Sequence, residues 1–135
     1  MTKSLLRPET KTTLQAFTVL ERAVLYARTS GDDTRKDGRN INGQLDDCRA
    51  YALEKGYSVV AEIKEDDRGA SGYELDLPGI NRILDMAEAG EFDVLVVREV
   101  DRLARNRTKK AVIKETLRRA NIRIDYVLQS FDDDP

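Results

Sequence analysis

The sequence contains no histidine and no tryptophan, and Cys48 is its only cysteine. Without histidine, a Ser-His-Asp triad, a histidine-liganded zinc site and a histidine general base are all excluded. A lone cysteine forms no intramolecular disulfide, and no apolar run is long enough for a membrane span or a signal peptide. We therefore expect a cytoplasmic protein without a membrane partner, whose chemistry depends on Ser, Asp, Glu, Lys, Arg, Tyr or Gln.

The charge is unevenly distributed, although the net charge is only -2 over 135 residues. From Arg98 to Arg119 there are nine basic residues against three acidic ones, an excess of six positive charges. Acidic residues gather elsewhere, in Glu62 to Asp67 and at the end of the chain. Such a chain can hold a polyanion on one edge while it remains acidic overall.

Short apolar runs alternate with stretches of helical spacing, an order typical of a mostly parallel sheet joined by right-handed helical crossovers. We predict an α/β fold with helices on both faces of that sheet, built from residues 22–135, and a loosely ordered leader at 1–21. The expected strands are Ala23 to Ala27, Ser58 to Ile63, Asp93 to Val97 and Ile122 to Leu128. The expected helices run from Ile41 to Lys55, from Pro78 to the stop at Gly90, and from the end of the polar segment 98–108 to about Ala120. Turns are expected at Gly31 to Asn40 and at Glu65 to Glu74.

Each expected helix carries one apolar stripe that should face the sheet. Cys48 falls on the first stripe, so it is predicted to be a small buried residue rather than a reactive thiol. The inward residues are expected to be Leu45, Cys48, Ala52 and Leu53, then Ile80, Ile83, Leu84 and Ala87, then Val112, Ile113, Thr116, Leu117 and Ala120.

Two polar segments follow strands that should end at the same rim of the sheet, where ligands of such folds bind. Arg28 and Ser30 leave the first strand, and the segment from Arg98 to Arg105 follows the third. Because the planar fork of arginine matches phosphate oxygens, this grouping favours a phosphorus substrate. The alternatives are a serine that caps a turn, and a solvated basic face with Arg102 and Arg105 paired to Glu99 and Asp101.

Four short motifs occur in order along the chain: 26–30 (YARTS), 40–44 (NINGQ), 67–72 (DRGASG) and 101–105 (DRLAR). In this order they resemble the catalytic domain of the serine recombinases, the resolvase and invertase superfamily, and within it the large serine integrases. The resemblance covers Ala23 to about Leu128, and four motifs in order are far more specific than one. It implies a flavodoxin-like resolvase catalytic domain.

By this resemblance, Ser30 would be the nucleophile that attacks a DNA phosphodiester and stays linked to the 5'-phosphate while the 3'-hydroxyl leaves. Arg28, Arg102 and Arg105 would clamp the non-bridging oxygens. Phosphoryl transfer asks the protein mainly for alignment and charge neutralisation, which guanidinium groups supply without a metal. Exchange of one phosphoester for another also needs no ATP, so we expect neither a metal nor a cofactor.

The resemblance further assigns Asp101 to orienting arginines or moving a proton, and Gln44 to positioning the phosphate. How the serine loses its proton stays open among nearby arginines, Asp101, the phosphate and water. Weaker contacts to DNA phosphates are expected from Arg68, Arg98 and Arg107. Tyr26 has two equal interpretations, a packing residue or a hydroxyl that reaches the site.

One position departs from the family. Its members usually carry an arginine of the phosphate clamp where this chain has Leu77, directly before Pro78. Either Arg68 or another cation substitutes, or the reaction is slower, or activity is lost. The other alternative is a flavodoxin-like nucleotide or cofactor binder, but no phosphate-binding glycine loop and no aromatic residue between Gly31 and Asn40 supports it.

The resemblance also implies partners. The expected substrate is double-stranded DNA, bound by a homodimer that becomes a tetramer when active. Family members continue from an acidic segment like 131–134 into a dimerisation helix and DNA-binding modules, so we expect this chain to be a truncated catalytic domain. The DNA site and the outcome of recombination cannot be derived from these residues.

Overall fold

A four-stranded parallel sheet forms the centre of the protein, in the order β3-β2-β4-β5. The computed structural model describes residues 19–29, 41–66, 77–99, 102–104 and 107–128. This confirms the α/β class and the parallel sheet predicted from the sequence. The strands are β2 (Arg22–Thr29), β3 (Ser58–Asp66), β4 (Val94–Val97) and β5 (Arg123–Tyr126), and the helices are α1 (Ile41–Lys55), α2 (Pro78–Glu88) and α3 (Arg107–Arg119).

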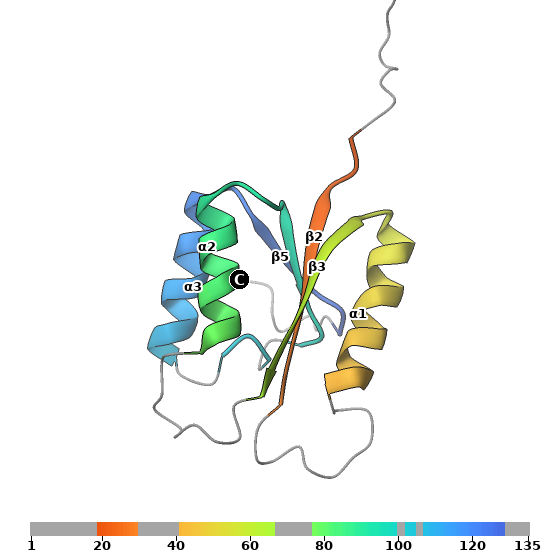
Figure 1. Ribbon diagram of the computed structural model, residues 1–135, viewed down its shortest axis with the longest axis horizontal. Helices are drawn as coiled ribbons and strands as arrows, with labels where there is room; N and C mark the ends of the chain where they lie inside the picture. The colour runs from red at the N-terminus through yellow and green to blue at the C-terminus, as the bar shows by residue number, and fades with distance from the viewer. Residues whose placement is uncertain (1–18, 30–40, 67–76, 100–101, 105–106, 129–135) are drawn as a thin grey trace, which may run out of the picture.

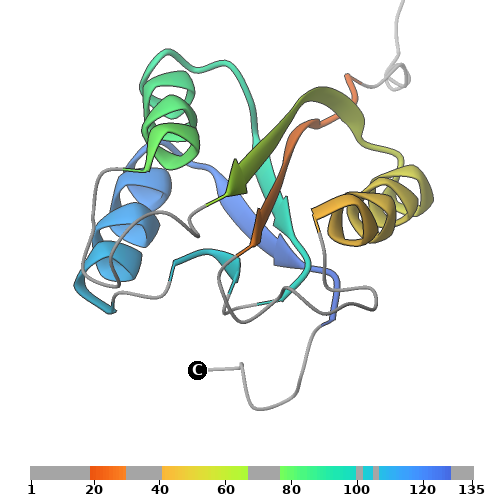
Figure 2. The same ribbon diagram turned by 60° about the horizontal axis from the view of Figure 1, so that its bottom comes forward.

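Helices cover both faces of the sheet, as predicted. Helix α1 lies alone on one face, and α2 and α3 lie side by side on the other (Figure 1). Seen from the end at which the strands finish, the sheet runs between these two layers (Figure 2). No helix within the described residues has the length and apolar character that a bilayer crossing requires.

The two central strands are buried on both sides, which explains their unbroken apolar runs. Every residue of Ala23–Ala27 and of β4 has no exposed surface. The prediction of two solidly buried strands is therefore confirmed. Strand β3 continues beyond Ile63 through polar residues to Asp66, because those residues pair with the end of β2. Strand β5 is shorter than predicted.

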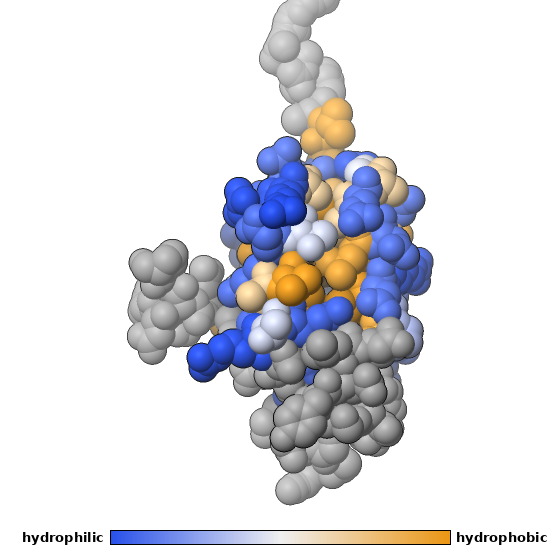
Figure 3. Space-filling view, turned by 90° about the vertical axis from the view of Figure 1, so that its left-hand side faces the viewer, coloured by the Kyte–Doolittle hydropathy of each residue, from blue (hydrophilic) through white to orange (hydrophobic). Residues whose placement is uncertain are grey.

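Two apolar residues predicted to face the sheet are exposed instead. Leu53 is 82% exposed and Val112 is 49% exposed. Successive helical residues are turned by about 100°, so a residue next to the centre of a buried stripe points to its flank. Leu53 follows the buried Ala52, and Val112 precedes the buried Ile113. On the side of the molecule where α2 and α3 lie, the surface shows an apolar area framed by hydrophilic side chains (Figure 3).

Helix α2 begins at a buried carboxylate rather than at a side-chain cap of its own. Its N-cap residue, Leu77, makes no capping hydrogen bond. Instead, Glu65 Oε2 accepts from the backbone N–H of Gly79 at 2.7 Å, and Glu65 Oε1 accepts from that of Ile80 at 3.0 Å and from the Tyr26 hydroxyl at 2.8 Å. Its negative charge also suits the positive end of the helix dipole.

The close approach of this carboxylate explains the glycine at position 79. A Cβ atom there would lie 2.7 Å from Glu65 Oε1 and 2.9 Å from Ile63 Cγ2. The sequence analysis assigned Glu65 to a turn, and that assignment was wrong, because Glu65 is buried within β3. It ties the end of β3 to both β2 and α2.

Replacing this carboxylate should destabilise the protein markedly. We expect Glu65→Gln to lower the free energy of unfolding by about 2 to 3 kcal/mol, because an amide offers one acceptor oxygen and no charge to three donors. Urea unfolding measures the change. The matched control is Glu62→Gln on the same strand, whose exposed pair with Arg49 should contribute less than about 1 kcal/mol. Equal losses in the two variants would contradict this role of Glu65.

The single cysteine should be inert in the folded protein. Cys48 is fully buried against the sheet, and burial, followed by the charge of Asp47, raises the pKa of its thiol to about 12. This confirms the prediction of a packing residue. Since the thiolate is the reactive form, Ellman's reagent at pH 8 should label Cys48 only after urea unfolding. Rapid labelling of the native protein would show that the α1 layer opens easily.

Candidate active site at the carboxyl ends of β2 and β4

The candidate site lies where the central strands end. Strands β2, β3 and β4 run parallel, so their carboxyl ends share one edge of the sheet, which we call the rim. The helices α1 and α2 begin at the same end (Figures 1 and 2). Arg28 is near the end of β2, and residues 102–104 follow β4 by a short connection. The rim therefore brings together two segments that are 74 residues apart.

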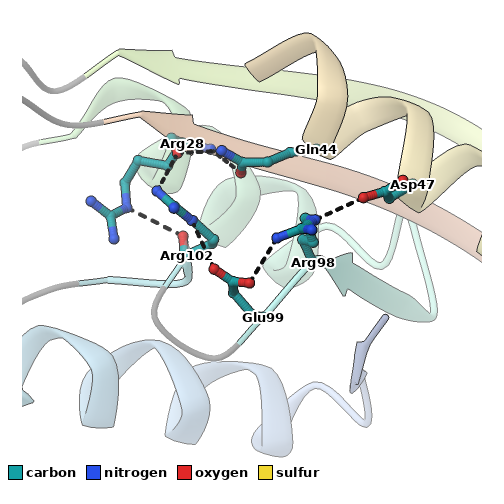
Figure 4. A network of polar contacts seen from close by, with 6 residues as sticks. All are labelled: Arg28, Gln44, Asp47, Arg98, Glu99 and Arg102. Atoms are coloured by element: carbon teal, nitrogen blue, oxygen red, sulfur yellow. Dashed lines mark hydrogen bonds and ion pairs between the residues drawn. The ribbon is translucent and has the colours of Figure 1, made fainter. Parts of the chain in front are cut away.

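Arg28 and Arg102 hold each other by a reciprocal pair of hydrogen bonds. Arg28 Nε donates to the Arg102 carbonyl oxygen at 3.2 Å, and Arg102 Nη1 donates to the Arg28 carbonyl oxygen at 3.3 Å (Figure 4). Arg28 is only 2% exposed and Arg102 only 7%. A solvated basic face, the alternative considered for Arg102, is therefore wrong for this residue. Two guanidinium groups are fixed at the rim rather than free in solvent.

The side chain of Gln44 continues the sheet where β4 stops. Pairing of β2 with β4 ends at Tyr26. Two residues further on, Gln44 Nε2 donates to the Arg28 carbonyl oxygen at 2.9 Å, and the Arg28 N–H donates to Gln44 Oε1 at 3.1 Å. The fully buried amide thus fixes the backbone of Arg28 from the first turn of α1. Its predicted contact with a phosphate stays a prediction.

A chain of ion pairs joins Arg102 to α1. Arg102 Nε lies 3.3 Å from Glu99 Oε2, and the Arg102 N–H donates to the Glu99 carbonyl oxygen. Glu99 Oε1 accepts from Arg98 Nη1 at 2.9 Å, and Arg98 Nε donates to Asp47 Oδ2 at 2.7 Å (Figure 4). The weak phosphate contact predicted for Arg98 stays a prediction. In the structure, the Arg98 guanidinium links Asp47 on α1 to Glu99.

The structure brings together four of the predicted site residues: Arg28, Gln44, Arg98 and Arg102. Arg107 is exposed at the start of α3. The predicted residues Ser30, Arg68, Asp101 and Arg105 lie outside the described residues. By sequence, Ser30 follows the last residue of β2, while Asp101 and Arg105 flank the described segment 102–104.

Tyr26 is fully buried in the core on the α2 and α3 side of the sheet. Its hydroxyl donates to Glu65, so it links β2 to the carboxylate that caps α2. This contact supports the packing interpretation of Tyr26.

Sequence reasoning missed Asp47 and gave Glu99 no role beyond a surface pair. For Glu99, the available signal was its spacing of three residues from Arg102. Asp47 had no such signal, because its partner Arg98 lies 51 residues away in the chain. Both acids matter because a buried guanidinium requires a nearby anion or hydrogen-bond acceptor to offset its loss of hydration.

The described side chains of the rim are suited to binding an anion. They include three arginines, Arg28, Arg98 and Arg102, and two carboxylates, Asp47 and Glu99. Planar guanidinium groups in fixed positions can bind phosphate oxygens in a bidentate way. Within the part of the chain that the structure describes, no cluster of three or more acidic or thiol side chains suits a metal ion.

Comparison with known proteins shows the family and the fold to which the chain is similar. The family model described as "Resolvase, N terminal domain" matches residues 23–135. The catalytic domain of ISC1926 TnpA, an IS607-like serine recombinase, is 30% identical with a TM-score of 0.67, over 84% of this chain and 70% of that one. The N-terminal catalytic domain of TP901-1 integrase is 26% identical with a TM-score of 0.67, over 79% of this chain and 78% of that one.

A curated relative is much longer. The Bacillus subtilis (strain 168) protein named "Putative DNA recombinase" is 28% identical over 111 residues, which are 82% of this chain and 21% of that protein. The chain therefore spans about a fifth of the length of that relative. With the family match over residues 23–135 and the recombinase folds above, this chain belongs to the resolvase N-terminal domain family, as the serine recombinase motifs of its sequence predicted.

Proposed function

We propose that this chain is the catalytic domain of a serine site-specific recombinase that cuts and rejoins double-stranded DNA. The observation that carries the proposal is the buried reciprocal pair of Arg28 and Arg102 at the rim. The nucleophile, Ser30, is two residues from one member of this pair, and Arg105 is three residues from the other. In the proposed site, the hydroxyl of Ser30 and the guanidinium of Arg105 would therefore come from the same two segments as the pair.

In the proposed reaction, Ser30 Oγ attacks the phosphorus atom of a DNA phosphodiester. A bond forms between Oγ and phosphorus, and the bond from phosphorus to the 3'-oxygen breaks. The serine proton passes to Asp101, phosphate or water, and the departing 3'-oxygen takes up a proton. Rejoining reverses these steps with the 3'-hydroxyl of another strand end. One phosphoester replaces another, so no external energy source is needed.

Arg28, Arg102 and Arg105 would offset the charge that builds on the non-bridging oxygens in the transition state. Gln44 would act by fixing the Arg28 backbone, and Asp101 by orienting the clamp. Arg68, Arg98 and Arg107 would add weak phosphate contacts.

Cleavage of both strands at two sites needs four nucleophiles, one from each chain. We therefore propose a homodimer that becomes a tetramer in the active full-length protein.

A second candidate function rests on Leu77. This residue occupies the place of an arginine in the family pattern, and it is buried in the core on the α2 side of the sheet. Position 77 therefore supplies no cation to the rim. A recombinase-like domain without cleavage activity, which acts in DNA or protein interaction, is the outcome if the following experiment gives no covalent adduct.

Covalent capture tests the nucleophile. Full-length protein is incubated with a pool of genomic DNA fragments and quenched with SDS, and protein-linked DNA is recovered. We expect an adduct through the 5'-phosphate that Ser30→Ala abolishes, because alanine has no attacking oxygen. Ser58→Ala, which removes a hydroxyl at the opposite end of the sheet, should leave the adduct unchanged. An adduct that persists in Ser30→Ala would disprove this mechanism.

The role of Arg102 in the phosphate clamp is tested by a substitution that keeps the positive charge and removes the planar guanidinium group. Arg102→Lys should slow adduct formation by about 10²- to 10³-fold, because lysine cannot offer paired, planar donors to phosphate. Thermal unfolding checks that the variant remains folded. Arg118→Lys on the exposed face of α3 is the matched control and should cleave at the normal rate. A normal rate in Arg102→Lys would remove Arg102 from the clamp.

A further inference from the structure

The ion pairs behind Arg102 form a continuous chain, which we call the Glu99 relay. It consists of Asp47 on α1, Arg98, Glu99 and Arg102, joined by contacts of 2.7, 2.9 and 3.3 Å in that order. Figure 4 shows the four side chains running from α1 toward Arg28. The relay therefore connects the surface of α1 to the guanidinium proposed to hold the DNA phosphate.

The two ends of the relay differ in burial, and the end at the rim is the more buried. The Asp47 side chain is 46% exposed, and the Arg102 side chain is 9% exposed. A carboxylate beside a buried guanidinium interacts with it more strongly than in water, since solvent screens the pair less. Glu99 is the anion of the described residues that contacts Arg102 most directly, and it is shared with Arg98.

Glu99 constrains the orientation of the Arg102 fork. Its carboxylate contacts Nε, whereas the Arg28 carbonyl oxygen accepts from Nη1. Anchors on two different nitrogens of a planar group fix both the direction of its plane and the rotation within it. A phosphate clamp needs this alignment before the substrate arrives, because misplacement by about 1 Å can cost about 10²-fold in rate.

We propose that Glu99 is a positioning residue that sets the plane of the Arg102 guanidinium, and that Asp47 supports it through Arg98. This inference rests on the proposed function. Glu99 also cancels one positive charge at the rim, so it weakens the general attraction for DNA while it improves the alignment. Its removal should therefore change DNA binding and cleavage in opposite directions.

The test uses Glu99→Gln in the full-length protein, which keeps the size of the side chain and removes its charge. We expect the single-turnover rate of adduct formation to fall about 10-fold or more, from a misaligned clamp. Affinity for non-specific duplex DNA, measured in a Ser30→Ala background, should be tighter, because counterion release grows with positive charge. Asp47→Asn should shift both quantities in the same directions by smaller amounts.

Glu115→Gln is the matched control. Glu115 also pairs with arginines three and four residues along the chain, but on the exposed face of α3. Glu115→Gln removes the same charge as Glu99→Gln, so the DNA affinities of the two variants can be compared directly. The cleavage rate of Glu115→Gln should be normal. If the wild-type protein forms the Ser30 adduct and the two variants cleave equally fast, the relay proposal is overturned while the proposed function stands.

Hydrogen exchange of the Arg102 side chain tests the positioning role of Glu99 even if the wild-type protein forms no adduct with DNA. In ¹H–¹⁵N spectra of the chain, the Arg102 Nε–H should exchange slowly with water, and Glu99→Gln should speed that exchange at least several-fold. Glu115→Gln should leave the signal unchanged. If the wild-type protein gives no adduct but this difference is present, the proposed function fails and the positioning role remains. Equal exchange in wild type and Glu99→Gln overturns the positioning role.

Discussion

The structure depends on how the ends of the central strands accommodate buried guanidinium groups. Arg28 and Arg102 lie in an interior where an unpaired charge would be very unfavourable. Each donates to the main-chain carbonyl oxygen of the other, and the carboxylate of Glu99 lies beside Arg102. This arrangement keeps two cations at one place on the rim. The parallel sheet makes it possible, because the carboxyl ends of β2 and β4 lie at the same edge of the sheet.

The two layers of helices support the rim by different means. On the single-helix face, α1 supplies both Gln44, which holds the Arg28 backbone, and Asp47, which begins the relay. On the other face, Glu65 joins Tyr26 on β2 to the first turn of α2. The strand that carries Arg28 is therefore fixed from both sides within its last residues. Such rigid support is what a preorganised site for phosphoryl transfer requires.

The start of α2 carries an uncharged residue at the position where the motif resemblance predicts an arginine. Leu77 packs into the core. The positive end of α2 is engaged by Glu65, a carboxylate from the same chain. The described cations of the rim consequently come from β2 and from the segment after β4.

The sequence by itself determined the order of strands and helices, the parallel sheet and its buried centre. Local signals were sufficient there: the apolar runs at Ala23 and Val94, and glycines at 56 and 90 that end helices with positive φ angles of 78° and 71°. The motifs also fixed the family and named Arg28, Gln44 and Arg102, which do meet.

Only the tertiary structure decided which polar groups are buried and what they contact. Glu65 was predicted to lie in a turn and Asp47 was given no role, because their partners lie at distant places in the chain. Leu53 and Val112 looked like core, because periodicity measures apolar spacing without the position of the sheet. Hydrogen bonds and ion pairs between remote segments depend on how the elements pack, and no local pattern encodes that geometry.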